Sequence, residues 1–444
     1  MSSGAATDTI VAPATPVGRS ALAILRIDGP RSAEILSQLA GIHAEERVAT
    51  LTHIHNSGDV LDECVAVRYA SPRSFTGNDM VELTLHGNPV LIERVLRAAL
   101  ELGARLAEPG EFTERAVLNG KMDLVQAESI ADLIAARTPL QAKLSLHNLD
   151  GLLSRTASRI RESLLSVISR LEAALDFSDE GYEFIGRDEV TKTVESAIDS
   201  CSTLRETFRR GRATTRGLSA VILGRPNAGK SALLNRLVGS DRAIVTPIPG
   251  TTRDIVRETI EIGGLPVTLA DTAGLRDSTD AVEEMGVERA RQAAGGADLV
   301  LYLVDAAAGL TSEDREELAR LEGNDVLEVF TKIDLAAAPA GETGISVATG
   351  AGVRELLTML DGIVRERFAV PEEAPTIVNE RQSQAVGECQ SALDEALHSL
   401  REGLDDQIVL VDLYRAANAL GILVGAITRD EILDAIFSKF CIGK

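Results

Sequence analysis

The stretch GRPNAGKS, residues 224–231, follows the apolar run 220–223 and opens a segment with an apolar helical pattern. It matches GxxxxGK[ST] in the strand–loop–helix context that this pattern requires. Its glycines let backbone N–H groups approach phosphate oxygens at the N-terminus of a helix. Lys230 then reaches the β- and γ-phosphates of a nucleotide, and Ser231 coordinates Mg²⁺. The stretch therefore predicts a P-loop nucleotide-binding domain of the α/β class.

Three further short motifs follow in the order expected of a GTPase. Asp271-Thr272-Ala273-Gly274 ends an apolar run, where the aspartate can hold Mg²⁺ through water and the glycine N–H can contact a γ-phosphate. Asp334, in the stretch TKID at 331–334, can accept hydrogen bonds from N1–H and the exocyclic amine of guanine, a donor pair that adenine lacks. Ser346-Val347-Ala348 is a predicted loop whose backbone N–H faces guanine O6. Together these motifs predict GTP as the ligand.

The segment TPIPGTTRD, residues 246–254, is a candidate switch I in which Thr252 is the second Mg²⁺ ligand. Leu275 rather than glutamine follows DTAG, so the water-orienting glutamine of Ras-type enzymes is absent and hydrolysis requires another group. The motifs resemble the translation-factor class of GTPases, in which asparagine usually stands in place of Thr331. Thr331 is therefore either a working substitute in the guanine site or an ordinary strand-end residue. The predicted nucleotide contacts are Asn227, Ala228, Gly229, Lys230, Ser231, Ala232, Thr246, Pro247, Ile248, Pro249, Gly250, Thr251, Thr252, Asp271, Thr272, Ala273, Gly274, Thr331, Lys332, Asp334, Ser346, Val347 and Ala348.

The rest of the chain divides around this domain. Short apolar runs alternate with helical patterns over 216–370, which argues for a parallel sheet with helices on both faces. Residues 1–120 mix α and β patterns, while 121–215 and 371–444 carry helical periodicity. We therefore predict a multidomain chain with an α+β N-terminal domain, an α-helical domain in two parts, and an inserted α/β P-loop GTPase (G) domain.

Several elements outside the G domain are specific predictions. Strands are expected at 20–27, 63–70 and 79–86, and His53 and His55 fit a surface strand better than a metal site. One long amphipathic helix is predicted through Leu146–Ala174, followed by an acidic loop at 176–189. The capping box of Thr428 and Glu431 predicts a last helix that carries Ile432, Ile436 and Phe440.

Composition narrows the class of protein. The 444 residues include 45 Lys+Arg and 67 Asp+Glu, a net charge of −22, so bulk electrostatics do not favour nucleic acid and any such contact needs a local basic patch or a partner. The four cysteines form no CxxC, which fits a reducing compartment. The sequence has neither a signal-peptide core nor an apolar run of eighteen residues, so we expect a cytoplasmic protein without a membrane span.

Beyond these motifs, nearly the whole chain resembles the MnmE (TrmE) family of tRNA modification GTPases. The resemblance includes DTIVAPATPVGR, ILRIDG, SFTGNDMVEL, AEPGEFTERAVLNGKMDLVQAE, GRPNAGKSALLN, IVTPIPGTTRD, DTAGLRD and the terminal IFSKFCIGK. It implies a folate-binding N-terminal domain, a helical domain and an inserted G domain. It also implies a homodimer whose G domains pair around K⁺, and an FAD-dependent partner, MnmG (GidA), in a heterotetramer or larger complex.

The reaction that the resemblance implies takes place on tRNA. The two proteins add an aminomethyl or carboxymethylaminomethyl group at C5 of the wobble uridine of certain tRNAs. The one-carbon unit comes from a tetrahydrofolate derivative, 5-formyl- or methylene-tetrahydrofolate. Hydrolysis of GTP powers or gates this modification.

The resemblance also assigns roles to single residues. Asn227, with Thr246, Thr251 and the carbonyl of Ile248, corresponds to the K⁺ ligands, and Glu283 corresponds to the glutamate that orients the attacking water. Glu284 is adjacent, so the catalytic assignment is ambiguous by one residue. The family's folate contacts correspond to Arg26, Glu82, Lys121 and Lys444.

Some interpretations stay open. Cys441 is either a functional thiol or a cysteine buried near an apolar helix end. Arg209, Arg210, Arg212 and Arg216 either touch tRNA phosphates or form a solvated hinge beside the G domain. Two rival functions also remain: a ribosome-assembly GTPase, and a folate-binding one-carbon carrier whose G domain is only a structural switch. The chain departs from the usual family sequence at Asn88, Thr331, Val347 and the segment LGILVGAITRDEILD.

Overall fold

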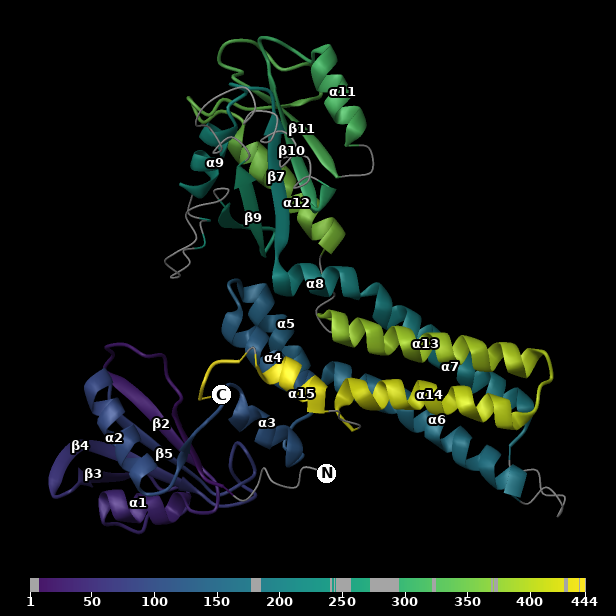
Figure 1. Ribbon diagram of the computed structural model, residues 1–444. Helices are drawn as coiled ribbons and strands as arrows, with labels where there is room; N and C mark the ends of the chain where they lie inside the picture. The colour runs from purple at the N-terminus through teal and green to yellow at the C-terminus, as the bar shows by residue number, and fades with distance from the viewer. Residues whose placement is uncertain are drawn as a thin grey trace, which may run out of the picture. The chain divides into compact units, whose positions relative to one another are not determined.

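The computed structural model describes residues 8–176, 185–239, 242, 244, 257–271, 295–321, 325–368, 370, 374–426, 430–438 and 440–443 (Figure 1). The chain forms two compact units. One unit comprises Met1–Ala131, Leu149–Glu195 and Ser391–Lys444, and the other comprises Asp132–Asn148 and Ser196–Gln390. The finer predicted division at residues 120, 215 and 370 stays a prediction.

The first unit begins with a six-stranded sheet in the order β3-β4-β5-β2-β1-β6, in which only β1 and β6 pair in parallel. The three predicted strands are confirmed as β2, β4 and β5. Helix α2 begins at Pro89, and the Asn88 side chain caps it by accepting a hydrogen bond from the N–H of Val90. The bounds in this region are β1 Ile10–Pro13, β2 Leu22–Asp28, α1 Ser32–Ala40, β3 Thr50–Asn56, β4 Asp59–Tyr69, β5 Met80–His86, α2 Pro89–Glu101 and β6 Arg105–Leu106.

The core of this sheet is aliphatic, as the low aromatic content requires. Alternate residues of β2 and β5, such as Leu25 and Leu83, pack against apolar residues of α1 and α2. His53 and His55 lie exposed on β3, which confirms the predicted surface strand. Helices α1 and α2 therefore cover one face of the sheet, and Phe112 packs with Ile10 and Ala12 of β1 in a separate apolar cluster.

The helices between the two sheets in the chain, and those at its C-terminal end, follow the predicted helical periodicity, with two corrections. The single helix predicted through Leu146–Ala174 is wrong, because helix α5 ends at Leu149 and α6 begins at Leu152. Gly151 between them has φ +83°, a left-handed conformation that an α-helix cannot contain and that glycine adopts without a steric cost. Phe440 lies beyond the end of α15, although it packs in the same apolar cluster as Phe437.

Helix α14 packs along α6. Helix α14 is long and apolar enough to cross a membrane by its length and composition alone. However, 56% of its 18-residue apolar stretch is buried within the protein, as in the core helix of a soluble protein. Thr428 of the predicted capping box, and part of the predicted acidic loop, lie outside the described residues. The bounds are α3 Glu111–Leu118, α4 Leu124–Ala135, α5 Pro139–Leu149, α6 Leu152–Asp176, α7 Arg187–Glu206, α13 Glu380–Arg401, α14 Asp406–Val424 and α15 Asp430–Phe437.

The second unit contains a six-stranded sheet in the order β12-β11-β10-β7-β9-β8. The expected parallel pairing is confirmed except at the edge, where β8 pairs antiparallel with β9. The two strands are joined by Gly263-Gly264, both with positive φ, and a two-residue turn of this kind can connect only antiparallel strands. The bounds are α8 Phe208–Arg216, β7 Leu218–Gly224, α9 Lys230–Val238, β8 Arg257–Ile262, β9 Leu265–Asp271, β10 Leu299–Asp305, α11 Ser312–Arg320, β11 Val326–Thr331, β12 Thr343–Gly344 and α12 Val353–Phe368.

Apolar clusters lie on both faces of this sheet. Helices α9 and α12 pack on one face with residues such as Leu233 and Leu360, and Leu318 of α11 packs on the other with Phe330. This arrangement confirms the predicted α/β layers. It also puts the ends of β7, β10 and β11 side by side, at the edge where parallel sheets of this type bind their ligands.

Candidate functional site

The P-loop connects β7 to α9, as the sequence predicts. Gly224 has φ +137°, and a Cβ atom there would lie 2.4 Å from the carbonyl oxygen of Leu303 on β10, so only glycine fits. Asn227 and Gly229 also have positive φ, of 63° and 94°. The loop therefore turns tightly and brings its backbone to the N-terminus of α9, where N–H groups can receive an anion.

Lys230 already lies over this loop. Its ammonium nitrogen donates to the carbonyl oxygens of Gly224 at 2.7 Å and Arg225 at 2.9 Å. Ser231 follows it in the first turn of α9 and is exposed. The positive charge and the hydroxyl thus lie at the same helix end, where the β- and γ-phosphates and a Mg²⁺ ion require them.

Thr331 ties the guanine-recognition segment to the P-loop. Its side chain is buried, and its hydroxyl oxygen lies 2.8 Å from the carbonyl oxygen of Ala228 and 3.2 Å from that of Val304. The hydroxyl therefore bridges the end of β11, the P-loop and the end of β10. The sequence left two interpretations of Thr331 open. The contact with Ala228 favours a role in the predicted nucleotide site over that of an ordinary strand-end residue, because it fixes the distance between the end of β11 and the P-loop.

Thr331→Val is expected to destabilise the G domain by about 1–3 kcal/mol, because it keeps the volume of the side chain and leaves a buried carbonyl without its donor. Urea unfolding of the full chain, with the GTP dissociation constant measured in parallel, tests this. Thr331→Ser is the matched control, since it keeps the hydroxyl and should retain most of the stability. A stable Thr331→Val beside a destabilised Thr331→Ser would mean that packing of the methyl group, rather than the hydrogen bond, matters.

The guanine-recognition segments lie next to each other. The N–H of Ile333 donates to the carbonyl of Ile345 at 3.2 Å, which joins the TKID turn to the loop that follows β12. Asp334 is exposed at this turn. Lys332 has φ +59°, and its ammonium group lies 2.7 Å from a carboxylate oxygen of Asp305, which lowers the pKa of Asp305.

The hydrogen bonds of the loop Ser346-Val347-Ala348 indicate which of its N–H groups can face guanine O6. Ser346 is buried, and its N–H donates to the carbonyl of Ala351 at 2.9 Å. Its N–H is therefore occupied. Among the described residues, the N–H groups of Val347 and Ala348 have no acceptor, so these two are the donors that can face guanine O6.

Part of the predicted nucleotide site lies outside the described residues. For Asp271 only the backbone is described, at the end of β9, where it pairs in register with Ile222 of the P-loop strand. The remaining predicted residues that lie outside are Thr246, Pro247, Ile248, Pro249, Gly250, Thr251, Thr252, Thr272, Ala273, Gly274 and Glu283.

A second candidate site lies on the N-terminal sheet. Arg26 of β2 and Glu82 of β5 are opposite each other in register, and the Arg26 Nη2 atom lies 2.7 Å from the Glu82 Oε1 atom. Both side chains are largely buried, with 13% and 20% of their surface exposed. The family resemblance assigns both to one site, and the structure joins them as a charge-assisted pair.

Three aromatic residues surround this pair, and sequence reasoning missed them. The Arg26 guanidinium lies over the rings of Phe75 and Phe112, 5.0 Å and 5.5 Å from their centroids. The Tyr69 hydroxyl lies 3.4 Å from Glu82, and burial, followed by the Glu82 charge, raises the pKa of Tyr69. Phe75 and Phe112 lie in the stretches SFTG and GEFTE. Aromatic residues make up only 3% of the chain, so an aromatic residue in each of these stretches was the signal that could have identified them as site residues.

The C-terminal tail reaches the same domain. Ile442 forms a β-bridge with Pro109, and a Cβ atom on Gly443 would lie 1.9 Å from the carbonyl oxygen of Pro13. Pro13 is adjacent to Ala12, the register partner of Arg26 on β1. The tail therefore lies close to the Arg26–Glu82 pair, and the glycine is required by this close approach.

The other residues predicted for this site are placed less closely. Cys441 is exposed, so the interpretation of a buried cysteine is wrong: the tail leaves α15 and runs along the domain surface. Lys121 is exposed, and its ammonium group donates to the carbonyl of Pro72 at 3.0 Å. Lys444 lies outside the described residues.

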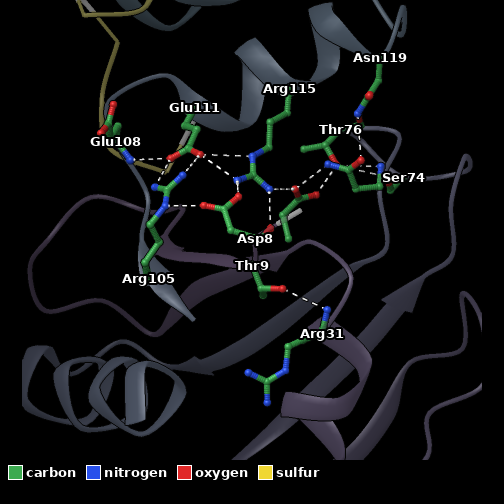
Figure 2. Close-up of polar contacts among 12 residues, drawn as sticks. Asp8, Thr9, Arg31, Ser74, Thr76, Arg105, Glu108, Glu111, Arg115 and Asn119 are labelled. Atoms are coloured by element: carbon green, nitrogen blue, oxygen red, sulfur yellow. Dashed lines mark hydrogen bonds and ion pairs between the residues drawn. The ribbon is translucent and has the colours of Figure 1, made fainter. Parts of the chain in front are cut away.

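A buried network of charges supports this site (Figure 2). Arg115 of α3 is 2% exposed, and its guanidinium lies 3.1 Å from Asp28, 2.6 Å from Asp8 and 2.9 Å from Glu111. Asp28 also accepts hydrogen bonds from Thr76 and Asn78, and burial raises the pKa of its carboxyl group. Arg115 lies one turn after Phe112, so the network fixes α3 and its aromatic ring against the sheet.

Two family models and several curated relatives match this chain. Residues 9–121 match the family model described as the GTP-binding protein TrmE N-terminus, and residues 124–441 match the model described as the MnmE helical domain. A relative from Symbiobacterium thermophilum, named tRNA modification GTPase MnmE, is 42% identical over 457 residues, which cover 98% of this chain and 99% of the relative. Relatives of the same name from Koribacter versatilis and Thermotoga maritima are each 41% identical over 454 residues, covering 98% of this chain and 99% and 100% of theirs.

Proposed function

Because this chain belongs to the MnmE family of tRNA modification GTPases, we propose that it hydrolyses GTP to power or gate modification of the wobble uridine of certain tRNAs. The modification is an aminomethyl or carboxymethylaminomethyl group at C5, made in the cytoplasm with an FAD-dependent partner of the MnmG type. The observation that carries the GTPase half is the Thr331 contact with Ala228, at 2.8 Å, because it joins the phosphate loop to the guanine segment.

The nucleotide is held by two sets of groups. Lys230 and the N–H groups of the P-loop hold the phosphates, while Asp334 and the N–H of Val347 or Ala348 select guanine. Mg²⁺ takes Ser231 and Thr252 as ligands, both of them hydroxyl oxygens that suit this ion. Thr252 rests on the switch I motif of the sequence and lies outside the described residues.

Potassium is the proposed activator. Asn227 lies in the P-loop with φ +63°, and its side chain is exposed. Its amide oxygen can therefore bind an ion beside the phosphates, and no buried side chain has to become exposed. Thr246, Thr251 and the carbonyl of Ile248 complete the set of oxygen ligands by family resemblance. A cation there stabilises the charge that develops on the phosphates in the transition state, as an arginine finger does in other GTPases. Pairing of the G domains in a homodimer closes this site.

The N-terminal domain is proposed to bind a tetrahydrofolate derivative, 5-formyl- or methylene-tetrahydrofolate, which supplies the one-carbon unit when bound. Three features support this. Glu82 offers a carboxylate for pterin N–H groups, and Phe75 and Phe112 offer apolar surface for a flat ring. Lys121 is an exposed cation that suits the glutamate tail, as does Lys444 by resemblance.

GTP hydrolysis measured in KCl and in NaCl at equal ionic strength tests the nucleotide half of the proposal. We expect turnover at least about tenfold faster in KCl, since one preorganised electrostatic stabiliser contributes roughly 10²–10³ in rate. Asn227→Ala should lose the preference for K⁺ while still binding GTP. Equal rates of the natural chain in both salts would remove the K⁺ mechanism and favour a ribosome-assembly type of GTPase.

A further inference from the structure

Four arginines form a stripe along the helices that lead into the G domain. Arg205 is in the last turn of α7, and Arg209, Arg212 and Arg216 are in α8. Thr207 between the two helices keeps helical angles, φ −75° and ψ −18°, so the backbone turns almost as one helix. The four residues follow each other at intervals of four, three and four, which puts them on one helix face. All four are exposed.

The positive charge of this stripe is concentrated. Residues 205–216 contain five arginines and one acidic residue, a net charge of +4 in a chain whose net charge is −22. Arg367 of α12 adds to it, because Arg367 and Arg209 pair with the same carboxylate, that of Asp325. One acidic side chain is thus shared by two guanidinium groups.

The stripe is held in place without being neutralised. The Arg209 guanidinium lies 5.5 Å from the centroid of the Phe368 ring, and that of Arg212 lies 5.9 Å from the Phe208 ring. Arg205 donates to the neutral side chain of Gln390. Within the described part of the chain, Arg209 is the one member of the stripe with a carboxylate within 4.0 Å.

Exposed arginines elsewhere on this acidic protein include members of ion pairs and also side chains, such as Arg155 and Arg354, with no carboxylate within 4.0 Å among the described residues. Arg97 pairs with Glu93, Arg170 with Glu189, and Arg401 with Glu195. The stripe is distinguished by the spacing of its arginines, which follow one another on one helix face, and this clustering favours an external polyanion as the partner of their guanidinium groups.

We propose that this stripe binds the sugar-phosphate backbone of tRNA. The inference rests on the proposed function and adds to it where this chain contacts its RNA. Successive arginines of the stripe are separated along the helix axis by about 4.5–6 Å, and each guanidinium can donate two parallel hydrogen bonds to one phosphate. Contacts of this kind position the RNA and do not read its bases. The acidic remainder of the surface repels RNA, so the stripe also sets its orientation.

The test compares two triple variants of the full-length chain that lose the same charge. Arg205→Gln, Arg212→Gln and Arg216→Gln remove three members of the stripe, and Arg209 is kept because it packs on Phe368. Arg94→Gln, Arg97→Gln and Arg401→Gln are the control, since these exposed arginines are paired with carboxylates. Affinity for an unmodified tRNA transcript is measured from 50 to 200 mM KCl, and thermal unfolding shows that each variant is folded.

We expect the stripe variant to bind tRNA about 10–100-fold more weakly at 50 mM KCl. Its slope of log affinity against log salt should be smaller by about 2–3, since each lost phosphate contact removes roughly 0.7–0.9. The control should keep the natural slope, and Arg216→Gln alone should lose about one contact. An unchanged slope in the stripe variant would overturn the inference, and so would a natural chain that binds no tRNA. Neither result bears on K⁺-dependent GTP hydrolysis, which tests the proposed function separately.

Discussion

Replacing Glu283 with alanine is expected to slow GTP hydrolysis by about 10²–10⁴-fold while leaving GTP affinity nearly unchanged. The segment after DTAG begins with Leu275 rather than glutamine, so another side chain must orient the attacking water. We propose Glu283 for this role because of the family resemblance, and Glu283 lies outside the described residues. A group that acts on the water and not on the ground-state nucleotide changes kcat rather than binding. Single-turnover hydrolysis and a fluorescent-nucleotide titration separate the two quantities.

Glu284→Ala is the matched control, because it removes the same group one residue away. It should retain most of the turnover. A slow Glu284→Ala beside a normal Glu283→Ala would move the catalytic assignment by one residue. Modification of tRNA by Glu283→Ala, with the flavoprotein partner present, answers a different question. If modification continued at the natural rate without hydrolysis, the G domain would be a structural switch on a one-carbon carrier.

Arg115→Ala is expected to lower the free energy of unfolding of the N-terminal domain by about 3–5 kcal/mol at pH 7. Arg115 is 2% exposed and Asp28 is fully buried, so the substitution leaves a carboxylate without water and without its cation. Hydrogen exchange of the amides in β2 and α3 reports this loss, and protection should fall by about 10²–10³-fold, since 1.4 kcal/mol corresponds to tenfold. Arg97→Ala, which removes an exposed pair on α2, should change stability by less than about 1 kcal/mol.

The loss in Arg115→Ala should depend on pH. Burial already raises the pKa of Asp28, and removal of the guanidinium raises it further. A group whose pKa is raised in the folded protein contributes stability below its unfolded pKa, and this contribution is lost as the pH rises through the folded value. The variant should therefore come closer to the natural chain near pH 4 and differ most at neutral pH. A deficit that is constant with pH would mean that lost packing, and not the bare carboxylate, is the cause.

The sequence was most informative where a motif fixes the backbone locally. The P-loop, the TKID turn and the strands β2, β4 and β5 were predicted at nearly their observed positions, because glycine spacing and apolar alternation act on adjacent residues. The errors also have local causes. Gly151 ends a helix that periodicity alone would continue, and the Gly263-Gly264 turn makes β8 antiparallel in an otherwise parallel sheet.

The contacts that assemble the candidate sites join residues far apart in the chain, and these the sequence could not predict. Thr331 reaches a P-loop carbonyl 103 residues away, and Arg115 reaches Asp28 across 87 residues. The aromatic rings around Arg26 and the sharing of Asp325 by Arg209 and Arg367 are of the same kind. Sequence alone determined which chemical groups the protein carries and the local backbone that presents them. Only the tertiary structure decided which groups meet, because a contact between distant residues depends on how whole helices and sheets pack and not on the propensities of either segment.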